Sequence, residues 1–273
     1  MAEDAIGAWL DHVSAHLARV MLLPLFPREG ALAAAFDAAL TRRGGGSANF
    51  ARHTRAQFVP GADRAGYVER AVPHKKLKEL RRQLRRLGDD GAVALSITGE
   101  PAAVPSALGD FLTLEAAGWK GRAGTAARDH ADLRTFVETA LAGLASEGKV
   151  EIARLCLDGR AIAAIIVLRS GDTAWTWKIA YDESHAHASP GVQLLLHVTH
   201  ALLADASIAR ADSCATPDHP MIDHVWRERL ALADRLIGLG PRSRADFAFA
   251  RVIEAARRTE LAAAKAVRDR LRG

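Results

Sequence analysis

Residues 149–181 contain three runs of strand length joined by two short turns, and this pattern constrains the fold more than any other feature. Lys149–Leu157 has strand character, and Asp158-Gly159 is a strong signal for a two-residue hairpin. Ala161–Arg169 is apolar enough for a central strand, and Thr173–Tyr181 follows a second turn. Consecutive strands joined by tight turns predict an antiparallel meander.

Helices and strands alternate on both sides of this meander. The expected elements are strands at Ala92–Thr98, Ile208–Ala215 and Leu232–Gly238, and helices at Pro105–Trp119, Asp129–Glu147, Pro190–Asp205 and His219–Leu230. This order resembles the GNAT acyltransferase fold, an α/β fold with a mixed, mainly antiparallel sheet flanked by helices. In that fold two neighbouring strands separate where a helix begins, and the acyl donor enters the split.

The N-terminal part reads as helix, strand, helix, strand. These segments are Asp4–Leu17, Arg19–Leu25, Gly30–Arg43 with Pro27 as its opening residue, and Ala48–Val59. Proline and glycine then bracket a helix at Pro73–Gly88. Its leucines form one stripe and its basic residues cover the rest, so we expect the stripe to pack and the basic face to point outward. A long helix rich in alanine and arginine is expected from Ser243 onward.

Composition excludes several classes of protein. Hydrophobic residues make up 49% of the 273 residues and charged residues 25%, which is typical of a globular chain. The two cysteines lie far apart without a CxxC pattern, which argues against a disulfide framework and fits a reducing cytoplasm. The N-terminus does not resemble a secretory signal, and no apolar run is long enough for a transmembrane span. A net charge of +5 permits an anionic partner without requiring one.

Four stretches carry a closer resemblance. They are FLTLEAAGWKGRAGTA (111–126), LDGRAIAA (157–164), WKIAYDESHAHASPGVQLLL (177–196) and IARADSCATPDHPMIDHVW (208–226). Together they resemble the CelD/BcsL-type, BioF-like acetyltransferase domain of the GNAT superfamily, which is similar to Fem-type aminoacyl transferases. The resemblance covers residues 73–236, and the basic helix is part of it.

Members of this group often resemble two GNAT modules in tandem. The resemblance therefore implies a partial N-terminal GNAT-like module at 1–72, a basic connecting helix at 73–90, a GNAT-like acyltransferase domain at 91–240 and a C-terminal helix at 241–273. The opening strands of the first module are missing, so the chain is expected to begin inside that module. An unfinished sheet edge near residues 19–25 would then need cover from another chain, as in a homo-oligomer, or solvent-tolerant residues.

The donor site implied by the resemblance lies at the start of the helix at residue 190. Acyl transfer from a thioester needs the donor held, its carbonyl polarised and protons moved. A helix N-terminus can bind phosphate, and glycine lets a ligand approach the backbone. Ser189, Pro190, Gly191 and Val192 are therefore the expected contacts of acetyl-CoA or another acyl-CoA. HAHASPG departs from the usual GNAT pattern Q/R-x-x-G-x-G/A, and a plain Pro-Gly helix start explains it equally well.

The third strand of the meander supplies the candidate catalytic residues. Alternation places Trp175, Trp177, Ile179 and Tyr181 on one face and Thr176, Lys178, Ala180 and Asp182 on the other. A lysine in the middle of a buried strand needs a carboxylate, a phosphate or water as partner, so Lys178 is a candidate ligand. Tyr181 could protonate the leaving thiolate, and Asp182 could act as a base or as the partner of Lys178. The alternative is that the aromatic residues are core.

Two further places complete the candidate site. Trp119 and Lys120 end a helix whose loop, in GNAT-like layouts, lies over the acceptor site, although tryptophan can simply anchor a helix end. Asp212 is a candidate acid or base at a strand end, and His219 and Trp177 are candidate substrate contacts. His219 and Asp223 would face together on a helix, with Asp218 as its cap. No HExxH or third ligand is present, so no metal is expected, and Ser213 and Cys214 lack the sequence of a nucleophile elbow.

The basic residues of Lys75–Arg86 have three interpretations: a solvated face, a contact to an anionic membrane surface, or an RNA contact. Fem-type relatives use aminoacyl-tRNA, which would bind here through phosphates because no aromatic residues interleave the basic ones.

The function expected from these observations is N-acyl transfer from acyl-CoA to an amine, either a small molecule or a peptidoglycan or polysaccharide precursor, in the cytoplasm. The alternatives are a Fem-like aminoacyl-tRNA-dependent transferase and a catalytically silent binding or scaffold module in polysaccharide assembly.

Overall fold

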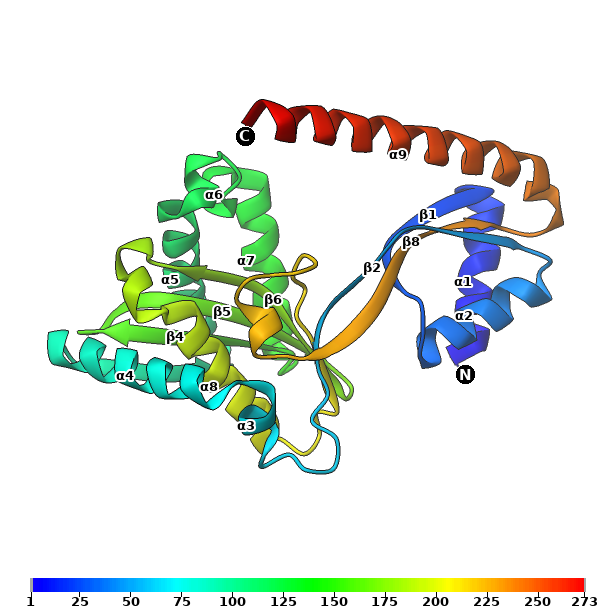
Figure 1. Ribbon diagram of the computed structural model, residues 1–273. Helices are drawn as coiled ribbons and strands as arrows, with labels where there is room; N and C mark the ends of the chain where they lie inside the picture. Colours follow the sequence, from blue (N-terminus) through cyan, green and yellow to red (C-terminus); the bar gives the residue numbers. More distant parts are fainter. Residues whose placement is uncertain (1, 273) are drawn as a thin grey trace. The chain divides into compact units, whose positions relative to one another are not determined.

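The computed structural model describes residues 2–272 (Figure 1). These residues form two compact units, one built from residues 2–54 with 230–272 and the other from Arg55–Arg229. The strand order is β1-β8-β2-β7-β6-β5-β4-β3. The β6–β7 pair is parallel, and the other pairs with a defined register are antiparallel. The expected α/β fold with a mixed, mainly antiparallel sheet flanked by helices is confirmed.

The expected meander lies in the second unit, as β4 (Val150–Leu157), β5 (Arg160–Ser170) and β6 (Thr173–Tyr181). β3 (Val93–Thr98) pairs with β4 on the outer side. Asp158 and Gly159 both have positive φ, as the hairpin signal requires. β5 is buried along most of its length, because its residues pack alternately against helices on the two faces of the sheet.

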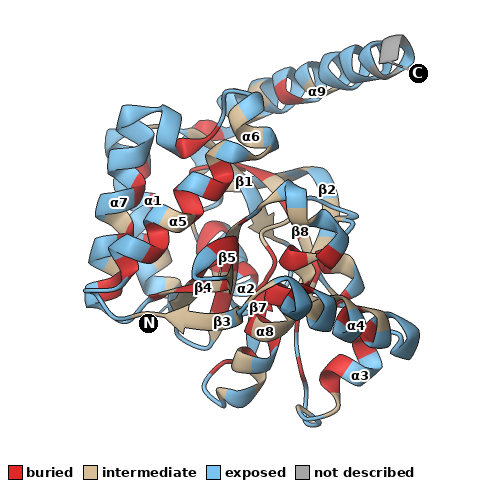
Figure 2. Ribbon diagram, turned by 90° about the vertical axis from the view of Figure 1, so that its left-hand side faces the viewer, coloured by how far each residue is buried: buried red, intermediate tan, exposed pale blue. Residues whose placement is uncertain are grey.

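Helices cover both faces of this sheet (Figures 1 and 2). α5 (Val104–Ala117) and α7 (Ala131–Ser146) pack on one face, in a core that includes Phe111, Leu141 and Ile166. α8 (Pro190–Ala204), α3 (Tyr67–Ala71) and α4 (His74–Asp90) pack on the other face, with Trp226 fully buried among them. The remaining elements of this unit are α6 (Trp119–Arg122), β7 (Arg210–Asp212) and the 3-10 turns Ala127–Asp129, Glu183–Ala188 and Ile222–His224.

The first unit contains α1 (Ala2–His16), β1 (Val20–Pro27), α2 (Ala31–Arg42), most of β2 (Gly46–Phe58), most of β8 (Glu228–Gly238), the 3-10 turn Pro241–Ser243 and α9 (Arg244–Arg272). Its core is made by Leu10, Phe36, Leu40 and Ile237 with their neighbours. β1 is the first strand in the sheet order, and its register with β8 shifts between Leu23 and Phe26. Such a bulge is a common way to make an edge strand a poor template for pairing.

Most element predictions are confirmed, and the exceptions have physical reasons. The helix expected at 219–230 is wrong: Cys214 and Asp218 have positive φ, and only a 3-10 turn precedes β8. Asp218 therefore caps no helix. Trp226 anchors this segment instead, because its buried ring nitrogen donates to Thr199 Oγ1. Pro27 ends β1 rather than opening α2, and α3 was not expected.

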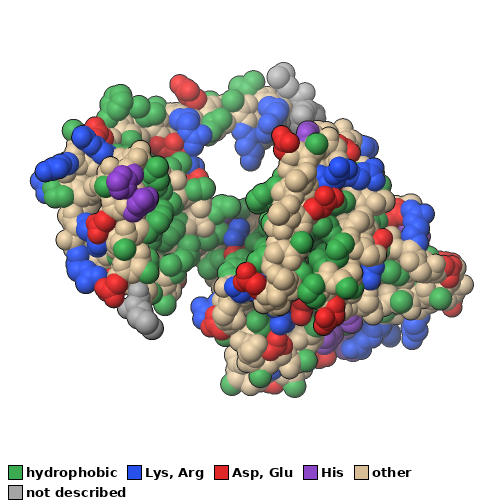
Figure 3. All heavy atoms as spheres, turned by 180° about the vertical axis from the view of Figure 1, so that it is seen from behind, with side chains coloured by type: hydrophobic (Ala, Val, Ile, Leu, Met, Phe, Trp, Pro, Cys, Tyr) green, Lys and Arg blue, Asp and Glu red, His purple; other side chains and the backbone are tan. Residues whose placement is uncertain are grey.

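Two further observations concern the distribution of surface charge and the lengths of the helices. Lys and Arg side chains are interspersed with Asp and Glu over the face drawn in Figure 3. Within residues 2–272 no helix combines the length and the apolar composition needed to cross a bilayer. The boundaries proposed from the tandem-module resemblance remain a prediction.

Candidate functional site

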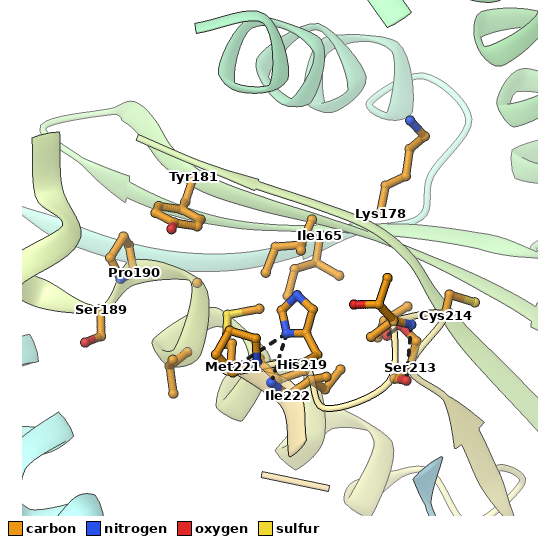
Figure 4. A pocket seen from close by; sticks show the side chains of 18 of the residues that line it. Ile165, Lys178, Tyr181, Ser189, Pro190, Ser213, Cys214, His219, Met221 and Ile222 are labelled. Carbon is orange, nitrogen blue, oxygen red and sulfur yellow. Dashed lines mark hydrogen bonds between the residues drawn. The ribbon is translucent and has the colours of Figure 1, made fainter. Parts of the chain in front are cut away.

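A cavity of about 630 Å³ opens in the second unit where β6 and β7 stop pairing (Figure 4). Their register covers three residue pairs and ends at Trp175↔Asp212, whereas β6 continues to Tyr181. Thr176 closes the paired end, because its hydroxyl donates to the carbonyl of Ser213 at 3.0 Å. The unpaired stretch of β6 therefore presents its backbone edge to the cavity, as a donor site of the GNAT type requires.

The start of α8 forms one wall. Ser189, Pro190, Gly191 and Val192 all line the cavity, so the structure brings together the four expected donor contacts. Ser189 has left-handed φ and ψ of 51° and 48°, and Pro190 begins the helix without needing a hydrogen-bond partner for an N–H.

Gly191 packs closely against its neighbours. A Cβ at this position would lie 2.9 Å from Met221 Sδ and 3.4 Å from Tyr181 Cδ1. The glycine therefore lets the first turn of α8 approach β6 and the loop after β7.

The faces expected for β6 are correct only in part, because a bulge interrupts the alternation. Ile166 pairs with Lys178 and Val167 with Thr176, so Trp177 is the extra residue. Ile179 packs in the core on the α8 face and Trp177 in the core on the α5 face. The alternation of side chains between the two faces of the sheet therefore reverses at the bulge.

Lys178 points to the face opposite to His219 and Met221 (Figure 4). Its Nζ donates to Glu115 Oε1 at 2.9 Å, and Lys120 Nζ donates to the same oxygen at 2.9 Å. The other carboxylate oxygen of Glu115 accepts the N–H of Ala127. Burial by itself would raise the pKa of Glu115, but the Ala127 N–H and the two ammonium groups outweigh it and hold this pKa below its ordinary value.

Sequence reasoning missed Glu115, although a signal was present. Glu115 lies four residues after Phe111 and seven after Leu108, on the apolar stripe of α5. A carboxylate on a buried stripe needs cationic partners, and the helix end together with β6 supplies them. Trp119, by contrast, is 62% exposed beside the cavity.

Asp182 and Asp212 have structural partners and do not line the cavity. The carboxylate of Asp182 accepts from the backbone N–H and hydroxyl of Ser184, which lowers its pKa and holds the turn before α8. Asp212 is buried, pairs with Arg55 at 2.5 Å and accepts the N–H of Cys214.

Cys214 lines the cavity, but burial and the Asp212 charge raise the pKa of its thiol to about 12. A thiol of this kind stays protonated at neutral pH, so it is a poor nucleophile.

His219 lines the cavity from the loop after β7. Its Nδ1 accepts the backbone N–H groups of Met221 at 3.3 Å and Ile222 at 3.5 Å. Burial lowers the pKa of His219, although Asp223 acts in the opposite direction. The ring is therefore neutral near pH 7 with its proton on Nε2, which makes it a hydrogen-bond donor.

Among the side chains of the described range, no group of three or more His, Cys, Asp or Glu is placed to hold a metal ion.

Residues 74–219 match the family described as an acetyltransferase (GNAT) domain, and this match spans more than half of the chain. The chain belongs to the GNAT acetyltransferase-domain family. The open β6–β7 edge, the helix start beside it and the family match thus identify the same part of the chain. No curated protein sequence matches the chain significantly.

Solved structures with this GNAT arrangement include FemX, with a TM-score of 0.56, 9% identity and coverage of 86% of this chain and 76% of that chain. The C-terminal DUF2156 domain of a proposed lysylphosphatidylglycerol synthetase from Agrobacterium fabrum has a TM-score of 0.55, 14% identity and coverage of 93% and 76%. A conserved protein of unknown function from Bacteroides thetaiotaomicron has a TM-score of 0.53, 10% identity and coverage of 86% and 74%. At these identities the likeness concerns the fold alone.

Proposed function

We propose that the chain is an N-acyltransferase that uses an acyl-CoA thioester as donor and an amine as acceptor. The observation that carries this proposal is the cavity between β6 and β7, with the start of α8 as its wall. The thioester would lie along the unpaired edge of β6, with the phosphates at Ser189–Val192. An acyl-CoA donor implies a cytoplasmic protein, and the finer assignment to the CelD/BcsL type belongs to this proposal.

The cavity residues divide the chemistry between them. The amine nitrogen attacks the thioester carbonyl, a C–N bond forms and the C–S bond breaks. The hydroxyl of Tyr181 donates its proton to the leaving thiolate and receives one from the attacking amine. His219 donates a hydrogen bond from Nε2 to the oxygen or sulfur on which negative charge develops.

Calorimetric titration of acetyl-CoA, with CoA as reference, tests the donor. We expect micromolar binding to the full chain. Ala186→Trp should abolish it, because Ala186 is exposed and lines the cavity mouth. His187→Trp is the matched control, since this exposed neighbour does not line the cavity and should leave binding unchanged. A wild-type chain that binds neither compound would exclude an acyl-CoA donor.

A second candidate is aminoacyl transfer from a tRNA donor, which the resemblance to Fem-type aminoacyl transferases implies; FemX shares the fold of this chain. The seven basic residues of α4 are exposed, while Leu77, Leu80 and Leu87 are buried, so the expected orientation of this helix is confirmed. Replacing Arg81, Arg82, Arg85 and Arg86 with glutamine should then remove salt-sensitive tRNA binding. If tRNA does not bind the wild type, this candidate fails, and failure of both donors would favour the binding or scaffold module.

A further inference from the structure

The cavity also reaches the opposite face of the sheet. Its lining includes Val192 and Leu195 from α8, and also Trp119, Lys120 and Lys178, which belong to the α5 face. A second hollow of about 30 Å³ lies against Glu115, Lys120 and Tyr181, and has room for one water molecule or one anionic oxygen. Open space therefore borders the unpaired part of β6 on both faces of the sheet.

The charges on the α5 face do not balance. Lys120 and Lys178 are both at 2.9 Å from a single oxygen of Glu115, so two ammonium groups share one carboxylate. Arg122 lies nearby but is neutralised by Glu183, which also accepts the N–H of Trp119. One positive charge thus remains among groups that are largely removed from water, since the side chains of Lys120 and Lys178 are only 25% and 22% exposed.

Two indole rings border the excess charge. Lys120 Nζ lies 5.8 Å from the centre of the Trp119 ring, and Lys178 Nζ lies 5.5 Å from that of Trp177. Each ammonium group is thus held over a tryptophan face, a position in which the ring attracts a cation. A carboxylate or phosphate of a ligand would satisfy the remaining ammonium hydrogens, because each lysine offers three donors.

We propose that this cluster of Glu115, Lys120 and Lys178 binds an anionic group of the acceptor, so that the acceptor is an amine carrying a carboxylate or a phosphate. The identification of the ligand as an acceptor rests on the proposed function, because the acceptor of an acyltransferase must enter beside the donor. It makes Lys120 and Lys178 determinants of specificity rather than groups that react.

Matched pairs of amines test the proposal without any donor present. The carboxylate pair is β-alanine and 3-aminopropanamide, and the phosphate pair is phosphoethanolamine and ethanolamine. Binding is followed by calorimetry and by the fluorescence of the adjacent tryptophans. In at least one pair, the wild type should bind the anionic member about tenfold or more tightly than its neutral partner.

Four substitutions test whether the preference arises in this cluster. Lys178→Gln and Lys120→Gln should each remove most of it, and Lys178→Arg should retain it. Glu115→Gln should strengthen anion binding, because it removes the competing carboxylate and keeps an acceptor for the Ala127 N–H. Lys149→Gln is the control, since Lys149 is paired with Glu147 on the surface of the same unit. Circular dichroism and thermal unfolding confirm that each variant is folded.

The outcomes separate this inference from the donor proposal. Equal affinity for both members of each pair, no binding at millimolar concentrations, or a preference that survives both lysine substitutions would overturn the inference. An anion preference in a chain that does not bind acetyl-CoA would leave the anion site standing and exclude the acyl-CoA donor. Binding of acetyl-CoA without an anion preference would support the acyl-CoA donor and overturn the anion site.

Discussion

Two ammonium groups and one backbone N–H converge on the carboxylate of Glu115, which explains how an acid on the buried stripe of α5 remains ionised. Removing the carboxylate altogether leaves two lysines without their partner in a site of low polarity. Such a change in a buried ion pair typically costs about 3–5 kcal/mol. Glu115 therefore stabilises the second unit at neutral pH as well as setting the charge of the site.

The lowered pKa of Glu115 predicts a specific dependence of stability on pH. A carboxyl group with a folded-state pKa below its ordinary value, about 4.3, contributes stability that is fully present above that pH and is lost as the pH falls through the folded-state pKa. Wild type should exceed Glu115→Gln in free energy of unfolding by about 3 kcal/mol at pH 7, the low end of that range because the amide still accepts the Ala127 N–H, and this difference should shrink below pH about 4.

Urea unfolding followed by tryptophan fluorescence measures this difference, because four of the five tryptophans lie in the second unit. Glu147→Gln serves as control, since Glu147 is exposed and its pairing with Lys149 is a surface contact. A difference between wild type and Glu115→Gln that stays constant from pH 7 to pH 3 would contradict the assignment.

The first turn of α8 packs against Met221 at Gly191. Replacing glycine with alanine inside a helix usually stabilises a protein by about 0.5–1 kcal/mol. Here the new Cβ would lie 2.9 Å from Met221 Sδ, so the Met221 side chain must move aside, and we expect Gly191→Ala to lose this gain and to leave the free energy of unfolding unchanged within about 0.5 kcal/mol. Met221→Ala removes the obstacle, and the two substitutions together should be less destabilising than the sum of the single changes.

Urea unfolding of the four proteins in this double-mutant cycle measures the coupling. Gly109→Ala is the matched control, because a Cβ at Gly109 in α5 meets no atom within 4 Å. That substitution should have the usual stabilising sign. Additive effects of Gly191→Ala and Met221→Ala would show that the close contact has no energetic consequence.

The sequence allowed most elements to be predicted, because the period-two runs, the hairpin signals and the Pro-Gly helix start are local properties. The bulge at Trp177 could not be predicted in this way. Tryptophan at 175 and 177 preserves an apparently regular alternation, whereas the actual register depends on how β5 pairs with β6. Strict alternation counted from Trp175 therefore assigns Lys178 to the wrong face of the sheet.

In the candidate site, too, some residues are placed by the local sequence, whereas others are brought together only by the fold. Ser189–Val192 form a continuous segment whose placement follows from the helix start alone. Glu115, Lys120 and Lys178 meet only because α5 packs on β6, and no spacing in the sequence joins residue 115 to residue 178. The roles of Asp182 and Asp212 likewise depend on partners, Ser184 and Arg55, that the structure identifies.

The cavity is built entirely from one of the two units, and this confines the expected effect of a donor. Every residue in its lining falls between positions 119 and 222, within Arg55–Arg229. At a donor concentration of 100 times the dissociation constant, binding should stabilise this unit by about 2.7 kcal/mol. Amide hydrogen exchange should therefore slow in β6, the start of α8 and the loop after β7, and should be unchanged in α1, α2 and α9.

Mass spectrometry of exchange with acetyl-CoA, compared with CoA and with the Ala186→Trp variant, makes this measurement. The variant should show no protection at any of these peptides. Protection that appears mainly in residues 2–54 and 230–272 would place the ligand outside the cavity and contradict the proposed donor site.

The unit formed by residues 2–54 and 230–272 is assembled from two segments that flank the other unit in the sequence, with Val20 of β1 paired to Gly238 of β8. On the ribosome, β1 is therefore made long before its partner, whereas Arg55–Arg229 emerges as one uninterrupted stretch. The unit formed by Arg55–Arg229 can therefore fold first during translation, and residues 2–54, although made before it, complete their own unit only after residues 230–272 emerge. Until β8 is made, the apolar run of β1 lacks the strand with which it pairs, which leaves it open to chaperones.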